Sequence, residues 1–144
     1  MYGIDIAEEG VKKADQKLRD LKTCAALTTG SIFRVLPYDT DFFDGIISVK
    51  VLHHGRIEDI QKVIKEIERV LKPKGFIFVS VRKPASNQKR LCEKDPRTYV
   101  GKKGILHSMF TRPLLRKEFD NFAIHDLWVG SGGYYCLFGE LKTG

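Results

Sequence analysis

The 144-residue chain has few cysteines and no long apolar run. Its three cysteines, Cys24, Cys92 and Cys136, stand far apart and form no Cys-x-x-Cys pair, which argues against a disulfide framework or a zinc finger. Free thiols favour a reducing compartment, so we expect a cytoplasmic protein. No segment approaches the ~18 apolar residues of a membrane span, and no membrane partner is expected. At this length we expect one domain, residues 1–144, with a core of its own.

Acidic residues are scarce in one part of the chain, where the positive charge gathers. The net charge is +7. The segment from Arg82 to Gly104 contains eight basic residues and only two acidic ones, Glu93 and Asp95. A random scatter of surface charge would not concentrate in this way, so the segment is expected to be a long loop that binds an anionic partner. Its one aromatic residue, Tyr99, does not strongly indicate base stacking.

Helix and strand patterns alternate along the chain. Apolar residues at helical spacing predict helices, and apolar runs predict buried strands, over 8–21, 45–52, 57–71 and 76–81. Weaker patterns predict a strand over 25–29, a short helix over 111–119, and a hairpin of 122–129 with 134–141. A strand, helix and strand with short joins form a right-handed parallel crossover. The sequence therefore predicts an α/β fold with a mostly parallel sheet flanked by helices and a closing antiparallel hairpin.

Polar and charged residues follow several of the predicted strands. Asp5 ends a short apolar run at a position where α/β folds hold the ribose hydroxyls of a nucleotide cofactor. Ser31, residues 50–54 and the basic segment follow other strands. Because ligands bind at the carboxyl ends of strands in such sheets, we expect the site at this edge.

Several segments together resemble class I S-adenosylmethionine-dependent methyltransferases. They are Gly3-Ile4-Asp5-Ile6, the run from Phe43 to Ser48 with Val51-Leu52-His53-His54, and the specific element Arg69-Val70-Leu71-Lys72-Pro73-Lys74-Gly75. The resemblance spans nearly the whole chain and implies a Rossmann-like fold, S-adenosylmethionine as cofactor and methyl transfer to an acceptor. It also implies a first strand and glycine-rich turn before Met1, so we expect an N-terminally incomplete domain. Two strands would then keep open edges, through which copies of the chain would associate.

The resemblance implies roles for individual residues. The expected cofactor contacts are Asp5 with the ribose, Ile6, Ser31 and Ile32 with the adenine, Val49 and Lys50 with the methionine part, and His54 near the methyl. Ser31 departs from the acid usual in the family, which weakens the site. The expected acceptor contacts are Arg82, Lys83, Lys89 and Arg90. They suit an anionic acceptor, either RNA or a small molecule bearing phosphate or carboxylate, and some transfer-RNA wobble-uridine methyltransferases have a similar double histidine. No catalytic residue is assigned, because methyl transfer needs mainly alignment.

Other interpretations remain open. A non-catalytic module of the same fold would bind an anionic partner through residues 82–104. A nicotinamide-dependent dehydrogenase would also place an acid near Asp5, but the Leu-Lys-Pro-x-Gly element and the hairpin argue against it. No metal site is expected, because adjacent His53 and His54 would point about 100° apart on a helix and no third ligand is evident. His107 and His125 are expected to be structural.

Overall fold

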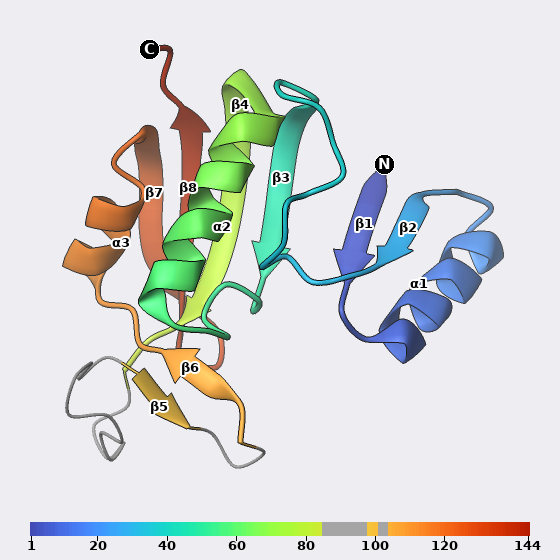
Figure 1. Ribbon diagram of the computed structural model, residues 1–144, viewed down its shortest axis with the longest axis horizontal. Helices are drawn as coiled ribbons and strands as arrows, with labels where there is room; N and C mark the ends of the chain where they lie inside the picture. Colours follow the sequence, from blue (N-terminus) through green and yellow to red (C-terminus); the bar gives the residue numbers. More distant parts are fainter. Residues whose placement is uncertain (85–97, 101–103) are drawn as a thin grey trace. The chain divides into compact units, whose positions relative to one another are not determined.

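The computed structural model describes residues 1–84, 98–100 and 104–144, which form two compact units, residues 1–36 and 37–144 (Figure 1). Each unit is described by itself. No helix in the described ranges is both long and apolar enough to cross a membrane.

The first unit is a strand, a helix and a strand. β1 (Tyr2–Asp5) and β2 (Ala26–Thr29) pair in parallel, and α1 (Glu8–Asp20) joins them. α1 has Glu8 and Glu9 in its first turn and basic residues in its last, the order that the helix dipole favours. The predicted helix and strand are therefore confirmed to within one residue, although α1 has no buried residue.

The second unit is built on a four-stranded sheet in the order β3-β4-β8-β7. Its strands are β3 (Phe43–Val49), β4 (Leu71–Arg82), β7 (Phe122–Gly130) and β8 (Tyr134–Leu141). β3 and β4 are parallel and are connected through α2 (Ile57–Val70), whereas β4–β8 and β8–β7 are antiparallel. The predicted crossover and the closing hairpin are both confirmed, and with them the α/β fold class.

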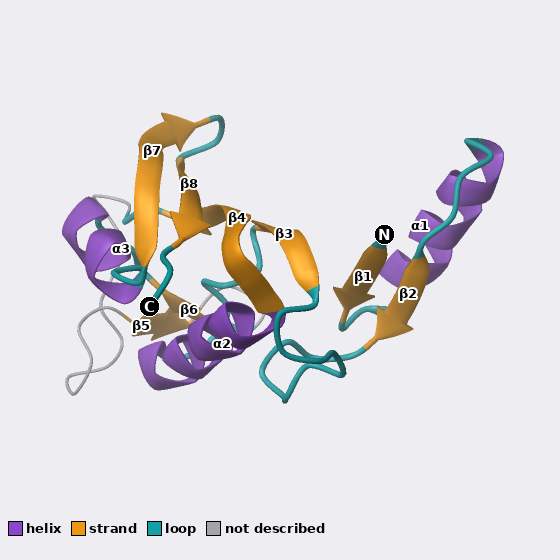
Figure 2. Cartoon of the chain, turned by 90° about the horizontal axis from the view of Figure 1, so that it is seen from above, coloured by secondary structure: helices purple, strands orange, loops and turns teal. Residues whose placement is uncertain are grey.

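The core lies between α2 and one face of this sheet. Figures 1 and 2 show α2 lying along that face, and its six buried residues are Ile57, Ile60, Val63, Ile64, Ile67 and Val70. Ile77, Val79 and Val81 of β4 are buried at alternate positions of the strand. Each fully buried side chain of this size stabilises the fold by about 1.5–3 kcal/mol. The apolar face predicted for residues 57–71 is thus the face that packs on the sheet.

A short helix, α3 (Arg112–Glu118), precedes β7 and lies beside it, at the end of the sheet away from β3. Thr111 caps it, since its side-chain oxygen accepts a hydrogen bond from the Leu114 N–H at 3.3 Å. Leu115 and Phe119 are fully buried. The predicted helix and its N-cap are confirmed.

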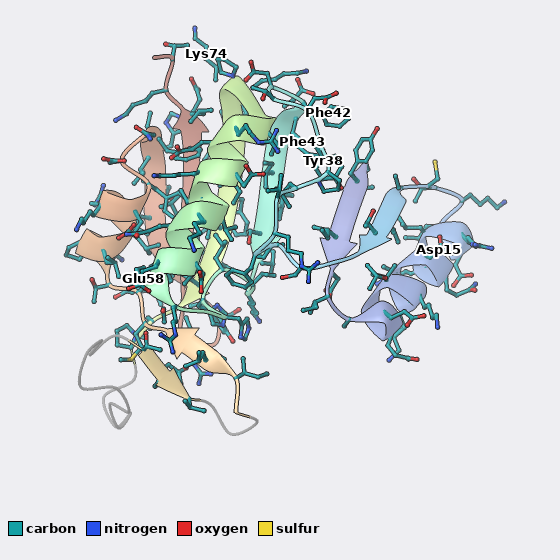
Figure 3. All side chains as sticks on the ribbon, in the orientation of Figure 1. Asp15, Tyr38, Phe42, Phe43, Glu58 and Lys74 are labelled. Atoms are coloured by element: carbon teal, nitrogen blue, oxygen red, sulfur yellow. The ribbon has the colours of Figure 1, made fainter. Side chains whose placement is uncertain are left out.

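Aromatic residues pack together where the chain enters β3. The rings of Tyr38, Phe42 and Phe43 lie within 4.8–5.7 Å of one another, measured between centroids (Figure 3). Arg69 on α2 donates to the Tyr38 carbonyl at 2.9 Å. The end of α2 and the start of β3 are thereby held together.

β3 differs from its prediction, because it is not buried on both faces. Ile47 is 77% exposed and Val49 is 51% exposed. Among the described residues β3 pairs only with β4, and the sheet face that carries Ile47 also leaves Phe76 and Phe138 exposed. An apolar run shows that a strand can be buried, but it does not reveal how many of its faces are covered.

The basic segment also differs from its prediction in its described part. β5 (Thr98–Val100) lies within the segment expected to be a loop, and it pairs with β6 (Leu106–Ser108), just after that segment, in a two-stranded antiparallel sheet. Strands of three residues are too short to show a clear alternation. Within the described ranges, β1 pairs only with β2, and β3 pairs only with β4.

Candidate functional site

Asp5 stands at the carboxyl end of β1, where the sequence predicts a ribose contact. Its Oδ1 accepts a hydrogen bond from the Ala7 N–H at 2.7 Å, which fixes the carboxylate at the start of α1. Asp5 is exposed, and the apolar side chain of Ile6 beside it is 74% exposed. A fixed, solvent-facing carboxylate suits a pair of ribose hydroxyls, and an exposed isoleucine suits a flat ring.

Ser31 and Ile32 follow the neighbouring strand, so the structure brings them to the same edge of the first unit as Asp5. Asp5 and Thr29 are paired residues, and the Gly30 N–H donates to the Asp5 carbonyl at 2.9 Å. The Ser31 hydroxyl accepts a hydrogen bond from the Phe33 N–H at 3.2 Å. This hydroxyl therefore shapes its own turn, in addition to any contact with a ligand.

Lys50 directly follows β3 in the second unit, next to the half-exposed Val49. Its backbone is left-handed, with φ of +58°, a conformation that costs a non-glycine residue about 1–3 kcal/mol. Its N–H donates to both the carbonyl and the hydroxyl oxygen of Ser80, each at 3.0 Å. The Nζ lies 4.6 Å from the ring centroid of Tyr134. Such strain is typical of functional sites, and here it places the Lys50 ammonium group at the end of β3.

Three histidines, which we call the histidine cluster, meet beside Lys50: His53, His54 and His107. One ring nitrogen of each lies within 4.8 Å of the others, and the ring centroids of His53 and His54 are 4.2 Å apart. His53 and His54 were expected to open the following helix. They lie instead in the turn before α2, which begins at Ile57, so their rings are not spread by helical geometry.

Ser108 holds the histidine cluster together. It is buried on β6, its N–H donates to the His53 carbonyl at 2.8 Å, and its hydroxyl donates to the Gly55 carbonyl at 2.7 Å. These two bonds tie β6 to the turn of residues 53–55. His107, which neighbours Ser108 in sequence, is thereby brought to the other two histidines.

The rings of the cluster are buried to different degrees. His53 is 2% exposed, and burial together with repulsion from the other two histidines and Arg82 lowers its pKa to about 3. Burial, then His54 and Arg82, also lowers the pKa of His107. Within the described chain, the Nδ1 atoms of His53 and His107 are buried without a hydrogen-bond partner. These imidazoles are therefore neutral and have unused nitrogen atoms.

The expected acceptor contacts fall on both sides of the described boundary. Arg82 ends β4, pairs in register with Tyr134 of β8 and is exposed, and the Lys83 N–H donates to the Gly133 carbonyl at 3.3 Å. Lys89 and Arg90 lie outside the described residues. In the second unit, Lys50, Arg82 and the histidine cluster thus gather at the carboxyl ends of β3 and β4.

Two aromatic residues, Tyr99 and Tyr134, also lie at this edge. The ring of Tyr99 stacks on His107 with centroids 5.0 Å apart, and Tyr134 lies under Lys50. No local pattern marks either residue. The available signals were the position of Tyr99 within the basic segment and that of Tyr134 at the start of the predicted strand 134–141.

Comparisons with known proteins identify the family of the chain. A family model described as a methyltransferase domain matches residues 1–79. The tRNA (carboxymethyluridine(34)-5-O)-methyltransferase of Arabidopsis thaliana is 35% identical over 80 residues, which are 55% of this chain and 18% of that protein. The chain therefore spans about a fifth of the length of this curated relative.

Solved structures share the fold. A methyltransferase from Methanosarcina mazei has a TM-score of 0.82 and 19% identity, with 99% of this chain and 82% of that chain covered. The Burkholderia thailandensis 1,6-didemethyltoxoflavin-N1-methyltransferase, solved with S-adenosylhomocysteine, has a TM-score of 0.77 and 16% identity, with 99% and 61% covered. The expected Rossmann-like fold and S-adenosylmethionine as the family's cofactor are confirmed. Because the family model matches more than half of this chain, the chain belongs to the class I S-adenosylmethionine-dependent methyltransferases.

Proposed function

We propose that this chain transfers the methyl group of S-adenosylmethionine to an anionic acceptor, and that the acceptor is a carboxylate-bearing uridine of RNA. The family match over residues 1–79 is the observation that supports methyl transfer. The 35% identity to a tRNA carboxymethyluridine methyltransferase supports the acceptor, as does the charge excess of residues 82–104.

Each predicted cofactor contact has a side chain whose chemistry supports the proposal. The Asp5 carboxylate would accept hydrogen bonds from the ribose hydroxyls, each charged bond contributing about 1.5–3 kcal/mol. Ile6 would pack on the adenine, and Val49 and Lys50 would flank the methionine part. When bound, the cofactor supplies a methyl group already activated by the positive sulfonium.

The acceptor would be held by cations at the end of β4. Arg82 is exposed there, so its positive charge can pair with a carboxylate or phosphate of the acceptor. A carboxylate has an ordinary pKa of about 4 and is already ionised at neutral pH. Its oxygen needs no general base to become a nucleophile, which agrees with the absence of a recognisable catalytic triad in the sequence.

A second candidate is a non-catalytic module that binds RNA through the basic segment. The observation that favours it is Ser31, which stands where an acid is usual and whose hydroxyl already accepts from Phe33. RNA binding that falls with salt, without measurable affinity for the cofactor, would support this alternative.

Calorimetric titration of S-adenosylhomocysteine into the purified chain tests the proposal. Asp5→Ala is expected to weaken binding by tenfold or more, about 1.4 kcal/mol. Asp15→Ala is the matched control, because Asp15 is an acid of the same unit on α1 (Figure 3), and its exposed ion pair with Arg19 contributes little. Equal affinity in wild type and Asp5→Ala would refute the ribose contact.

Transfer is then measured with radiolabelled cofactor. The acceptors are a transfer RNA that carries carboxymethyluridine and the same RNA with unmodified uridine. Label on the first RNA only is expected, and label on neither with intact cofactor binding would refute the acceptor.

A further inference from the structure

We propose that His53, His54 and His107 form a binding site for a divalent transition-metal ion such as Zn²⁺. The proposal rests on where the fold brings these three side chains, from the turn before α2 and from β6. It does not depend on the proposed function, since metal binding is measured without cofactor or RNA.

The first support is the set of unused nitrogen atoms. The His53 side chain is almost completely buried, and its Nδ1, like that of His107, has no hydrogen-bond partner within the described chain. Buried polar atoms in native proteins are nearly always paired, so two unpaired imidazole nitrogens in one cluster call for a ligand. A metal ion satisfies them, because it accepts the lone pair of a neutral imidazole.

The second support is the geometry. Tetrahedral Zn²⁺ binds imidazole nitrogen at about 2.0–2.1 Å, which places ligand nitrogens roughly 3.3 Å from one another. The three ring nitrogens lie within 4.8 Å of one another, so closure requires shifts of roughly 1.5 Å or less. His54 and His107 are only half-buried and can make these shifts by rotating their rings.

The third support is that the cluster is held by hydrogen bonds that leave the rings free. Ser108 uses its N–H and hydroxyl to bind the carbonyls of His53 and Gly55, and the Tyr99 ring packs flat against His107. The backbone is therefore organised before any ligand arrives. Sites with such support lose little freedom when they bind.

The ligand set indicates which metal fits. In the described part of the chain, the cluster contains imidazole only, without carboxylate or thiolate. Imidazole suits Zn²⁺, Cu²⁺ and Ni²⁺, whereas Mg²⁺ and Ca²⁺ prefer oxygen. Three protein ligands leave a fourth position open. The charge of Arg82, which acts on His53 and His107, opposes the cation but favours an anionic oxygen in that fourth position.

The test is titration of the metal-free, untagged chain with Co²⁺ and Zn²⁺, followed by absorption and calorimetry. We expect one ion per chain, visible cobalt bands of a tetrahedral site, and no thiolate-to-cobalt charge-transfer band. His107→Gln and His54→Gln are each expected to weaken binding at least tenfold. His125→Gln, an exposed histidine of β7 outside the cluster, is the matched control and should bind as wild type.

A measurement on the wild-type chain avoids the case in which a variant does not fold. Histidine-ring nitrogen resonances are recorded as Zn²⁺ is added, and three of the four histidines should shift while His125 does not. Absence of binding, a thiolate band, unchanged affinity in His107→Gln, or an equal effect of His125→Gln would each overturn the proposal.

Discussion

Removal of the Ser108 hydroxyl is the sharpest test of how the histidine cluster is held. This hydroxyl donates to the Gly55 carbonyl at 2.7 Å, and Ser108 is 1% exposed. Ser108→Ala leaves the backbone bond from the Ser108 N–H to the His53 carbonyl in place. The change therefore removes one of the two bonds between β6 and the turn, without a large cavity.

The expected cost follows from burial. A typical hydrogen bond contributes about 0.5–1.5 kcal/mol, and a buried carbonyl left without its partner costs about 1–3 kcal/mol. Since Gly55 is only half-buried and water can reach part of it, we expect a loss of about 1–2 kcal/mol in the free energy of unfolding. For a chain of this size each kilocalorie lowers the Tm by roughly 2–5 °C.

The assay is denaturant unfolding followed by circular dichroism, together with a Tm. Ser131→Ala, in the exposed turn between β7 and β8, is the matched control and should unfold as wild type. If Ser108→Ala were as stable as the control to within about 0.5 kcal/mol, this hydroxyl would not hold the turn. The account of how His107 reaches His53 would then be wrong.

Two further predictions concern the core and the basic edge. Ile60→Ala, at a fully buried position of α2, should lower the free energy of unfolding by about 2–5 kcal/mol in denaturant titrations; Val35→Ala, at an exposed position, should change little, and similar losses at both positions would contradict the assigned core. Arg82→Gln should weaken RNA binding and reduce the slope of log affinity against log salt by about one. Arg116→Gln, exposed on α3, is its control, and an unchanged slope for Arg82→Gln would exclude a phosphate contact there.

Local patterns were sufficient for the helices and the hairpin. Residues 57–71 carry an apolar stripe that only a helix can turn to one side, and α2 buries that stripe. The glycines between Val129 and Tyr134 allow a tight return, and Gly132 and Gly133 adopt φ of +72° and +76°. Such features depend on neighbours in the chain, so the sequence carries them in full.

A local sequence pattern could not predict that one face of β3 is exposed, or that the short strands β5 and β6 form. Ile47 belongs to an apolar run, yet whether its face is covered depends on elements far away in the sequence. β5 and β6 have three residues each, and β6 is tied to the turn after β3 by the hydrogen bond from the Ser108 N–H to the His53 carbonyl.

The sequence by itself determined the fold class, the family and the acid at the end of β1, because these depend on short motifs and on spacing along the chain. Only the tertiary structure decided the histidine cluster. His107 lies more than fifty residues after His53, and no periodicity connects them. They meet because β4 carries the chain back beside β3 and Ser108 then binds the turn that holds His53, a contact made across space and invisible in the order of residues.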